Sequence, residues 1–153
     1  MNTTNLFTVA EVQLTYKNHA DLMKRPELTS TKDVAKFMQE VEEMKNNIDY
    51  KELFYVIYLN QACRVLSICK IAEGTTTHCL VNIRQIMQGA ILQNATGMMI
   101  CHNHPSGNVK PSREDVRLTS NIKEAAKLFD IELLDSFVIS SFNYYSFLES
   151  GLL

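Results

Sequence analysis

The sequence predicts an α/β fold in which a mixed central β-sheet is flanked by helices. Two observations lead to this prediction. Apolar residues recur at helical spacing in three separate stretches, and short runs rich in β-branched and aromatic residues lie between and after them. The chain has 153 residues, which is close to the usual size of one domain and long enough to bury a core.

The first part of the chain predicts a strand and then a helix. Residues 10–17 alternate between apolar and polar side chains, as in a half-buried strand. A capping-box spacing begins at Ser30, and apolar residues then recur at helical intervals over residues 34–44, which indicates an amphipathic helix. We therefore expect an N-terminal strand and loop extension, residues 1–29, before a domain formed by residues 30–153.

The centre of the chain predicts a hairpin, a helix and a strand. Leu53–Leu59 and Val65–Ile71 are rich in β-branched and aromatic residues, and a polar interval separates them. Residues 83–94 have the apolar spacing of a second amphipathic helix. The apolar segment Met98–Cys101 then indicates a short strand that runs directly into His102.

The last third of the chain predicts one more helix and at least one more strand. Apolar residues recur at helical intervals after Ser112, and an apolar strand is expected around Ile131–Ile139. An aromatic segment closes the sequence. The order of elements is therefore mixed α and β throughout.

Composition and charge exclude several classes of protein. The formal net charge is −2, so the whole-chain field gives nucleic-acid binding no support. The N-terminus lacks a basic start followed by a long apolar stretch, and no run of about 18 apolar residues occurs, which predicts a soluble, cytoplasmic protein outside the membrane. The four cysteines lack CxxC spacing and are expected to be free thiols. Glycine-rich phosphate loops are absent.

One stretch, CHNHPSGNVKPSREDV at residues 101–116, carries recognisable chemistry. Two histidines separated by one residue, His102 and His104, project from the same side of a strand, so both imidazoles can reach one ion. Proline and glycine then force a turn, and the first turn of the next helix carries Asp115. Two histidines and one carboxylate are the three protein ligands of a catalytic zinc site that keeps its fourth position open.

Each part of this pattern also fits a simpler interpretation. A histidine at a strand end is often a surface residue or a satisfied core group, and Ser112 with Asp115 has the spacing of a plain helix cap. The combination of a preceding strand, a turn and a returning carboxylate favours metal binding over coincidence.

The pattern HxHPSG followed by PSxxD, at residues 102–107 and 111–115, resembles the metal signature of JAMM (MPN-type) metalloproteases and especially of RadC-like proteins. The resemblance extends over residues 52–153, through the segments ELFYVIYLN, ILQNATGMMI, DIELLDSFVIS and YYSFLESGLL. It implies the cytidine-deaminase-like architecture of JAMM domains. It also implies one Zn²⁺ per chain, held by three ligands, His102, His104 and Asp115.

The resemblance also implies a mechanism. Glu52 stands where the family has a glutamate beside the metal, at the start of the early core strand, and would act as general acid and base. Without the resemblance, Glu73 would be an equal rival. The Ser112 hydroxyl could donate a hydrogen bond to the carbonyl oxygen of the substrate as negative charge develops there.

Two departures from the family pattern affect the functional hypotheses. RadC-like proteins often carry a helix-hairpin-helix region before the metal domain, and no glycine hairpin precedes Glu52 here, which weakens the case for DNA contact. Asp135 and Ser136 stand where family members commonly have Asp-His, so any role of that histidine is absent.

The preferred hypothesis is a zinc-dependent peptidase or isopeptidase that acts on a polypeptide. One alternative is a RadC-type role in DNA repair or mobile-element maintenance, and another is a non-catalytic binding module stabilised by zinc. The alternating residues 10–17 could also pair edge to edge with a second copy, so a homodimer is a further expectation.

Overall fold

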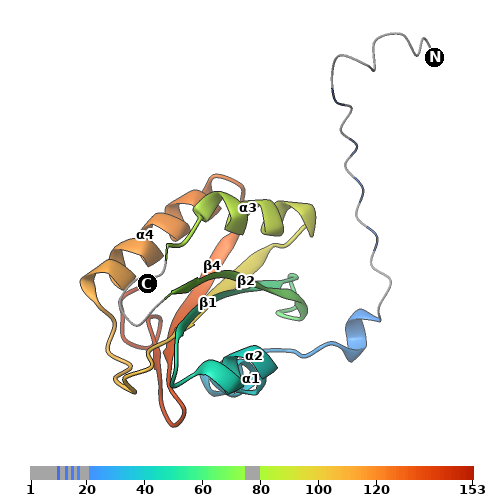
Figure 1. Ribbon diagram of the computed structural model, residues 1–153. Coiled ribbons are helices and arrows are strands. Elements are labelled where there is room, and N and C mark those ends of the chain that lie inside the picture. The colour runs from blue at the N-terminus through green and yellow to red at the C-terminus, as the bar shows by residue number, and fades with distance from the viewer. Residues whose placement is uncertain (1–9, 11–12, 14, 16, 18–20, 75–79) are drawn as a thin grey trace, which may run out of the picture.

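A five-stranded sheet forms the centre of the molecule, with the strand order β2-β1-β3-β4-β5 (Figure 1). The computed structural model describes residue 10, residue 13, residue 15, residue 17 and residues 21–74 and 80–153. The strands are β1 (Glu52–Leu59), β2 (Val65–Gly74), β3 (Gly97–Asn103), β4 (Glu132–Ile139) and β5 (Tyr144–Ser146). The helices are α1 (Thr31–Glu40), α2 (Glu42–Asn47), α3 (Ile83–Leu92) and α4 (Arg113–Lys127), with a 3-10 turn at Leu22–Lys24. The predicted α/β class is confirmed.

The sheet is mixed, as predicted. β1 runs antiparallel to both of its neighbours, β2 and β3, and β5 runs antiparallel to β4. β3 and β4 are parallel, and α4 is the connection between them. Because the chain must return from the end of β3 to the start of β4, the N-terminus of α4 lies near the carboxyl end of β3.

Two hydrophobic layers cover the two faces of the sheet (Figure 1). α1 and α2 pack on one face, where Tyr55 and Ile57 of β1 point, and α3 and α4 pack on the other, where Val56 and Tyr58 point. This division follows from the alternation of side chains along a strand. β1 and β3 are buried almost throughout, since both faces of the central strands are covered.

The first helix is shorter than the sequence predicts. The apolar periodicity continues through residue 44, but α1 ends at Glu40 and α2 begins at Glu42. Val41 between them is extended, with φ −60° and ψ 120°. Buried residues from both helices join the same core cluster, so the apolar pattern crosses the break without revealing it. The capping interaction at Ser30 is confirmed, because its side chain accepts a hydrogen bond from the Asp33 amide.

The predicted strand at residues 10–17 lies largely outside the described residues, and the four of them that are described belong to no helix or strand. The segment just before α1 packs against the β1–β2 hairpin. The Pro26 carbonyl accepts from the Val65 amide at 2.9 Å, the Leu28 amide donates to the Cys63 carbonyl at 3.1 Å, and Leu28 is buried. The domain boundary at residues 29 and 30 stays a prediction.

The described part of the chain contains no helix that is both long and apolar enough to cross a membrane. Within that same part, Cys63, Cys69 and Cys101 are free thiols, while Cys79 lies outside it. Cys101 is buried among the core residues beneath α1 and α2, on the face opposite His102, because side chains alternate along a strand. Burial strongly raises the pKa of its thiol, which agrees with a packing role.

Gly89 of α3 provides a stability test of the packing between α3 and the sheet. A Cβ atom at Gly89 would lie 2.3 Å from the hydroxyl oxygen of Tyr58, which is fully buried and donates to the Ile86 carbonyl. Alanine normally stabilises a helix relative to glycine, but here overpacking outweighs that gain. We expect Gly89→Ala to lower the free energy of unfolding by about 1 to 2 kcal/mol in urea titrations.

The control is Gln88→Ala at the exposed neighbouring position of the same helix, which we expect to change stability by about 0.5 kcal/mol or less. A Gly89→Ala protein more stable than wild type would contradict the tight approach of α3 to Tyr58.

Candidate metal centre

The carboxyl end of β3 places two imidazoles side by side. The Nε2 atoms of His102 and His104 lie 3.1 Å apart. His102 is the last buried residue of β3 on the face of the sheet beneath α4. The His104 amide donates to the Ile139 carbonyl at 3.1 Å, so the extended backbone continues one residue past β3. The prediction that both rings project from one side of the strand is confirmed.

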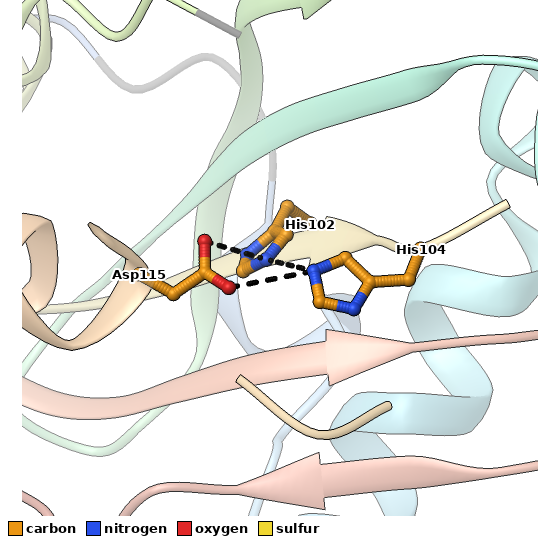
Figure 2. Close-up of side chains that lie close together, drawn as sticks. All are labelled: His102, His104 and Asp115. Atoms are coloured by element: carbon orange, nitrogen blue, oxygen red, sulfur yellow. Dashed lines mark hydrogen bonds and ion pairs between the residues drawn. The ribbon is translucent and has the colours of Figure 1, made fainter. Parts of the chain in front are cut away.

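α4 returns a carboxylate to the histidines (Figure 2). Asp115 Oδ1 lies 3.3 Å from His102 Nε2, and Asp115 Oδ2 lies 3.4 Å from His104 Nε2. These three side chains form a group that could hold a metal ion, because their ligand atoms all lie within 4.8 Å of one another. His102 is buried, and His104 and Asp115 are partly buried.

The first turn of α4 is also a complete capping box. Ser112 Oγ accepts from the Asp115 amide at 3.1 Å, and the Ser112 amide donates to Asp115 Oδ2 at 2.7 Å. The simpler interpretation of this pair as a helix cap is therefore correct, but it does not exclude a metal ligand. Asp115 takes part in the capping box while both of its carboxylate oxygens still face the histidines. The cap fixes the direction in which the carboxylate points.

The contacts between Asp115 and the histidines shift the pKa values of Asp115 and His104. Burial would raise the pKa of Asp115, but hydrogen bonds with His102 and His104 outweigh burial and hold that pKa well below its usual range. The hydrogen bond with Asp115 raises the pKa of His104, although burial opposes the shift; the Asn108 carbonyl and the charge of Glu52 also favour the protonated ring. A metal ion binding here must displace that proton.

The orientation of both rings is fixed by neighbours outside the ligand set. His104 Nδ1 lies 2.7 Å from the Asn108 carbonyl oxygen. Because a carbonyl can only accept, Nδ1 carries a proton, and in the neutral ring the Nε2 lone pair is left for a metal. The ring of His102 stacks on Phe54, with centroids 6.0 Å apart. Two imidazole nitrogens and one carboxylate oxygen fit the donor set of a catalytic zinc site.

Glu52 lies at the start of β1, on the same face as the histidines. Phe54 pairs with His102 across the antiparallel β1–β3 ladder, and Glu52, two residues earlier in β1, shares the face of Phe54. Its charge contributes to the raised pKa of His104. The Glu52 carboxylate makes no hydrogen bond or ion pair with any other residue that the structure describes, which leaves it available to a bound molecule.

Glu73, the rival of Glu52 in the sequence, points to the other face of the sheet. It pairs with Leu53, whose side chain belongs to the core beneath α1 and α2. Its carboxylate forms ion pairs with Lys51 at 3.2 Å and with Lys70 at 2.8 Å. The geometry therefore favours Glu52 over Glu73 as the carboxylate beside the histidines.

Two residues near the ligands behave differently from each other. Ser106 shapes the turn after His104, since its Oγ accepts from the Asn108 amide. Asn103, directly before His104, takes no part in that turn: it is fully buried on the opposite face, where it bonds to residues at and just before the start of β1. In the sequence, only the position of Asn103 in the strand indicates this role. Alternation directs its side chain into a core, and a polar group in a core needs hydrogen-bond partners.

Ser136, where family members commonly have histidine, contacts α4 through a buried hydrogen bond between its hydroxyl and that of Thr119, at 3.0 Å. The adjacent Asp135 points to the other face and accepts from the Ser146 hydroxyl and the Leu148 amide. Burial raises the pKa of Asp135 despite these bonds. Both residues link structural elements and lie outside the ligand group.

Comparisons with known proteins agree with this geometry. The model of the RadC-like JAB domain matches residues 28–152. A UPF0758 protein of Flavobacterium johnsoniae is 33% identical over 145 residues, which are 94% of this chain and 62% of that protein. A UPF0758 protein of Clostridium acetobutylicum is 38% identical over 126 residues, 82% of this chain and 53% of that protein.

A UPF0758 protein of Thermotoga maritima is 33% identical over 143 residues, 93% of this chain and 62% of that protein. The chain thus spans little more than half the length of these relatives. The matched range includes all three residues of the candidate metal group and the whole sheet. This chain belongs to the RadC-like JAB domain family.

Proposed function

We propose that this chain is a zinc-dependent metallohydrolase that cleaves peptide or isopeptide bonds in a polypeptide, with one zinc ion per chain. The observation that carries the proposal is the convergence of His102, His104 and Asp115, with Glu52 on the same face of the sheet, two residues before the strand partner of His102. Three protein ligands and a nearby carboxylate are the parts of a site for metal-assisted hydrolysis with a general base.

His102, His104 and Asp115 would hold a zinc ion, which when bound would supply a Lewis acid and lower the pKa of water at its open position to about 7. The residues of the chain supply the remaining chemistry. Among the described residues, the group that could hold a metal ion has three members. Three protein ligands are the number that a catalytic zinc site uses, because its fourth position binds water or substrate.

Glu52 is the general base and then the general acid of this proposal. Its carboxylate takes a proton from the attacking water as the new bond to the carbonyl carbon forms. The same proton passes to the leaving nitrogen when the carbon–nitrogen bond breaks, so that Glu52 ends the cycle as a carboxylate. Its lack of described partners and its place on the face of the histidines support this role.

Ser112 is the proposed donor to the carbonyl oxygen of the substrate. Its Oγ accepts from the Asp115 amide, and its own proton has no acceptor among the described residues. The hydroxyl is exposed at the N-terminus of α4, where the helix dipole also favours negative charge. One such donor contributes about 3 kcal/mol to stabilisation of the developing oxyanion.

The first prediction concerns zinc itself. At a free zinc concentration about 100 times the dissociation constant, zinc should raise the free energy of unfolding by about 2.7 kcal/mol. His104→Ala and Asp115→Ala should lose both the stabilisation and the zinc found by elemental analysis. Glu114→Ala, which removes the exposed carboxylate next to the ligand in the same helical turn, should keep both. A wild-type protein that takes up no zinc at neutral pH would overturn the proposal.

The second prediction concerns hydrolysis. The zinc-loaded protein is incubated with a library of linear peptides and of peptides branched through lysine side chains, and the products are identified by mass spectrometry. Glu52→Gln should keep its zinc but cleave about 10² to 10⁴ times more slowly, because proton transfer is lost. If wild type and Glu52→Gln give the same products at the same rates, the hydrolase assignment fails.

The third prediction separates the two roles of Ser112. Glycine is nearly as good a helix N-cap as serine, so Ser112→Gly should cost only a few tenths of a kcal/mol of stability, roughly as expected for cap exchanges. Hydrolysis should fall about 10²-fold, because the hydroxyl donor is gone. The control is Ser30→Gly at the N-cap of α1, which should leave hydrolysis unchanged. Full activity in Ser112→Gly would remove Ser112 from the mechanism.

A further inference from the structure

Asn103 lies between the two histidines of the candidate site, but its side chain points to the opposite face of the sheet. It is fully buried, and it pairs with Ile139, which belongs to the core beneath α1 and α2. A carboxamide has one acceptor oxygen and two N–H donors, and in a core these groups need partners. The hydrogen-bond partners of Asn103 therefore show which part of the chain its side chain holds in place.

All three hydrogen bonds of this carboxamide reach residues 48–53, at and just before the start of β1. Asn103 Oδ1 accepts from the Leu53 amide at 2.7 Å. Its Nδ2 donates to the carbonyl of Ile48 and to that of Lys51, each at 2.8 Å. The Lys51 carbonyl and the Leu53 amide belong to the two peptide bonds that flank Glu52. Asn103 thus holds the backbone of Glu52 on both sides.

The backbone ladder does not provide this attachment. The pairing of β1 with β3 begins at Phe54, opposite His102, so Leu53 and Glu52 lie beyond its first rung. Glu52 pairs with Gly74 of β2 on its other side. On the side of β3, the Asn103 side chain takes the place of the missing rung.

We propose that Asn103 is a positioning residue that sets the Glu52 carboxylate relative to the metal ligands. This inference rests on the proposed function. We call the three hydrogen bonds from Asn103 the clamp on Glu52. Because His102, Asn103 and His104 are consecutive, the same stretch of backbone carries both histidine ligands and this clamp. Misplacement of a reacting group by about 1 Å can cost about 10²-fold in rate, so such a clamp has a measurable effect.

Two variants test the clamp. Asn103→Asp keeps the shape of the side chain and an acceptor for Leu53, but it cannot donate to both carbonyls. Asn103→Ala removes all three hydrogen bonds, and if it does not fold, the aspartate variant carries the test. The control is Ser146→Ala, which removes another buried polar contact, to Asp135, on the same face of the sheet.

The first readout is zinc affinity, which should stay within about threefold of wild type in both Asn103 variants, because the carboxamide touches no ligand. The second is the ¹³C chemical shift of the Glu52 carboxyl carbon, assigned by its absence in Glu52→Gln. Zinc should move this signal in wild type and in Ser146→Ala. In the Asn103 variants that movement should fall by about half or more, since the carboxylate is no longer held beside the metal.

With a substrate in hand, kcat of the Asn103 variants should fall about 10²-fold while KM changes by less than about threefold. If zinc does not move the Glu52 signal in wild type, the general base of the proposed function is wrong. If zinc moves it equally in wild type and both Asn103 variants, the proposed function stands and the clamp is refuted. An equal loss in Ser146→Ala would also refute it, because general loosening would then explain the effect.

Discussion

The register between β1 and β3 is the constraint on which the candidate site depends. It pairs Phe54 with His102 and so puts Glu52, two residues earlier in β1, on the same face beneath α4. A slip by one residue would turn Glu52 toward the other core, because side chains alternate along a strand. The register is strongly specified because both faces of the sheet are covered by a packed core. After a slip, each side chain would lie in a core that is packed around a different side chain. The same hydrophobic packing that stabilises the fold therefore places the carboxylate.

The N-terminus of α4 contributes the second half of the site through an interaction that also starts the helix. Asp115 belongs to the capping box with Ser112 and faces both histidines. Helix initiation and ligand orientation are thus the same contact, and the βαβ connection from β3 to β4 decides where it occurs. This explains why neither a helix cap nor a metal ligand could be excluded from the sequence spacing alone.

Much of this arrangement could be read from the sequence, because periodicity reports which side of an element is buried. It predicted the hairpin, the three amphipathic stretches and the common side of His102 and His104. It could not show the break at Val41, since the apolar pattern runs across it. It also missed the partners of Asn103, because those contacts join positions about fifty residues apart and depend on the strand register.

Contacts among the three ligand side chains hold them close to one another. The His104 ring donates from Nδ1 to the Asn108 carbonyl, and its Nε2 lies near both His102 Nε2 and Asp115. In the protonated ring, the Nε2–H lies close to both groups, and its hydrogen bond with Asp115 raises the pKa of His104. The pKa of His104 lies above its ordinary value of 6.5. The protonated ring therefore stabilises the folded state fully below pH 6.5, and this stabilisation is lost as the pH rises through the raised pKa. Loss of the proton then frees the nitrogen that a metal requires, so the proton and the metal compete for one position.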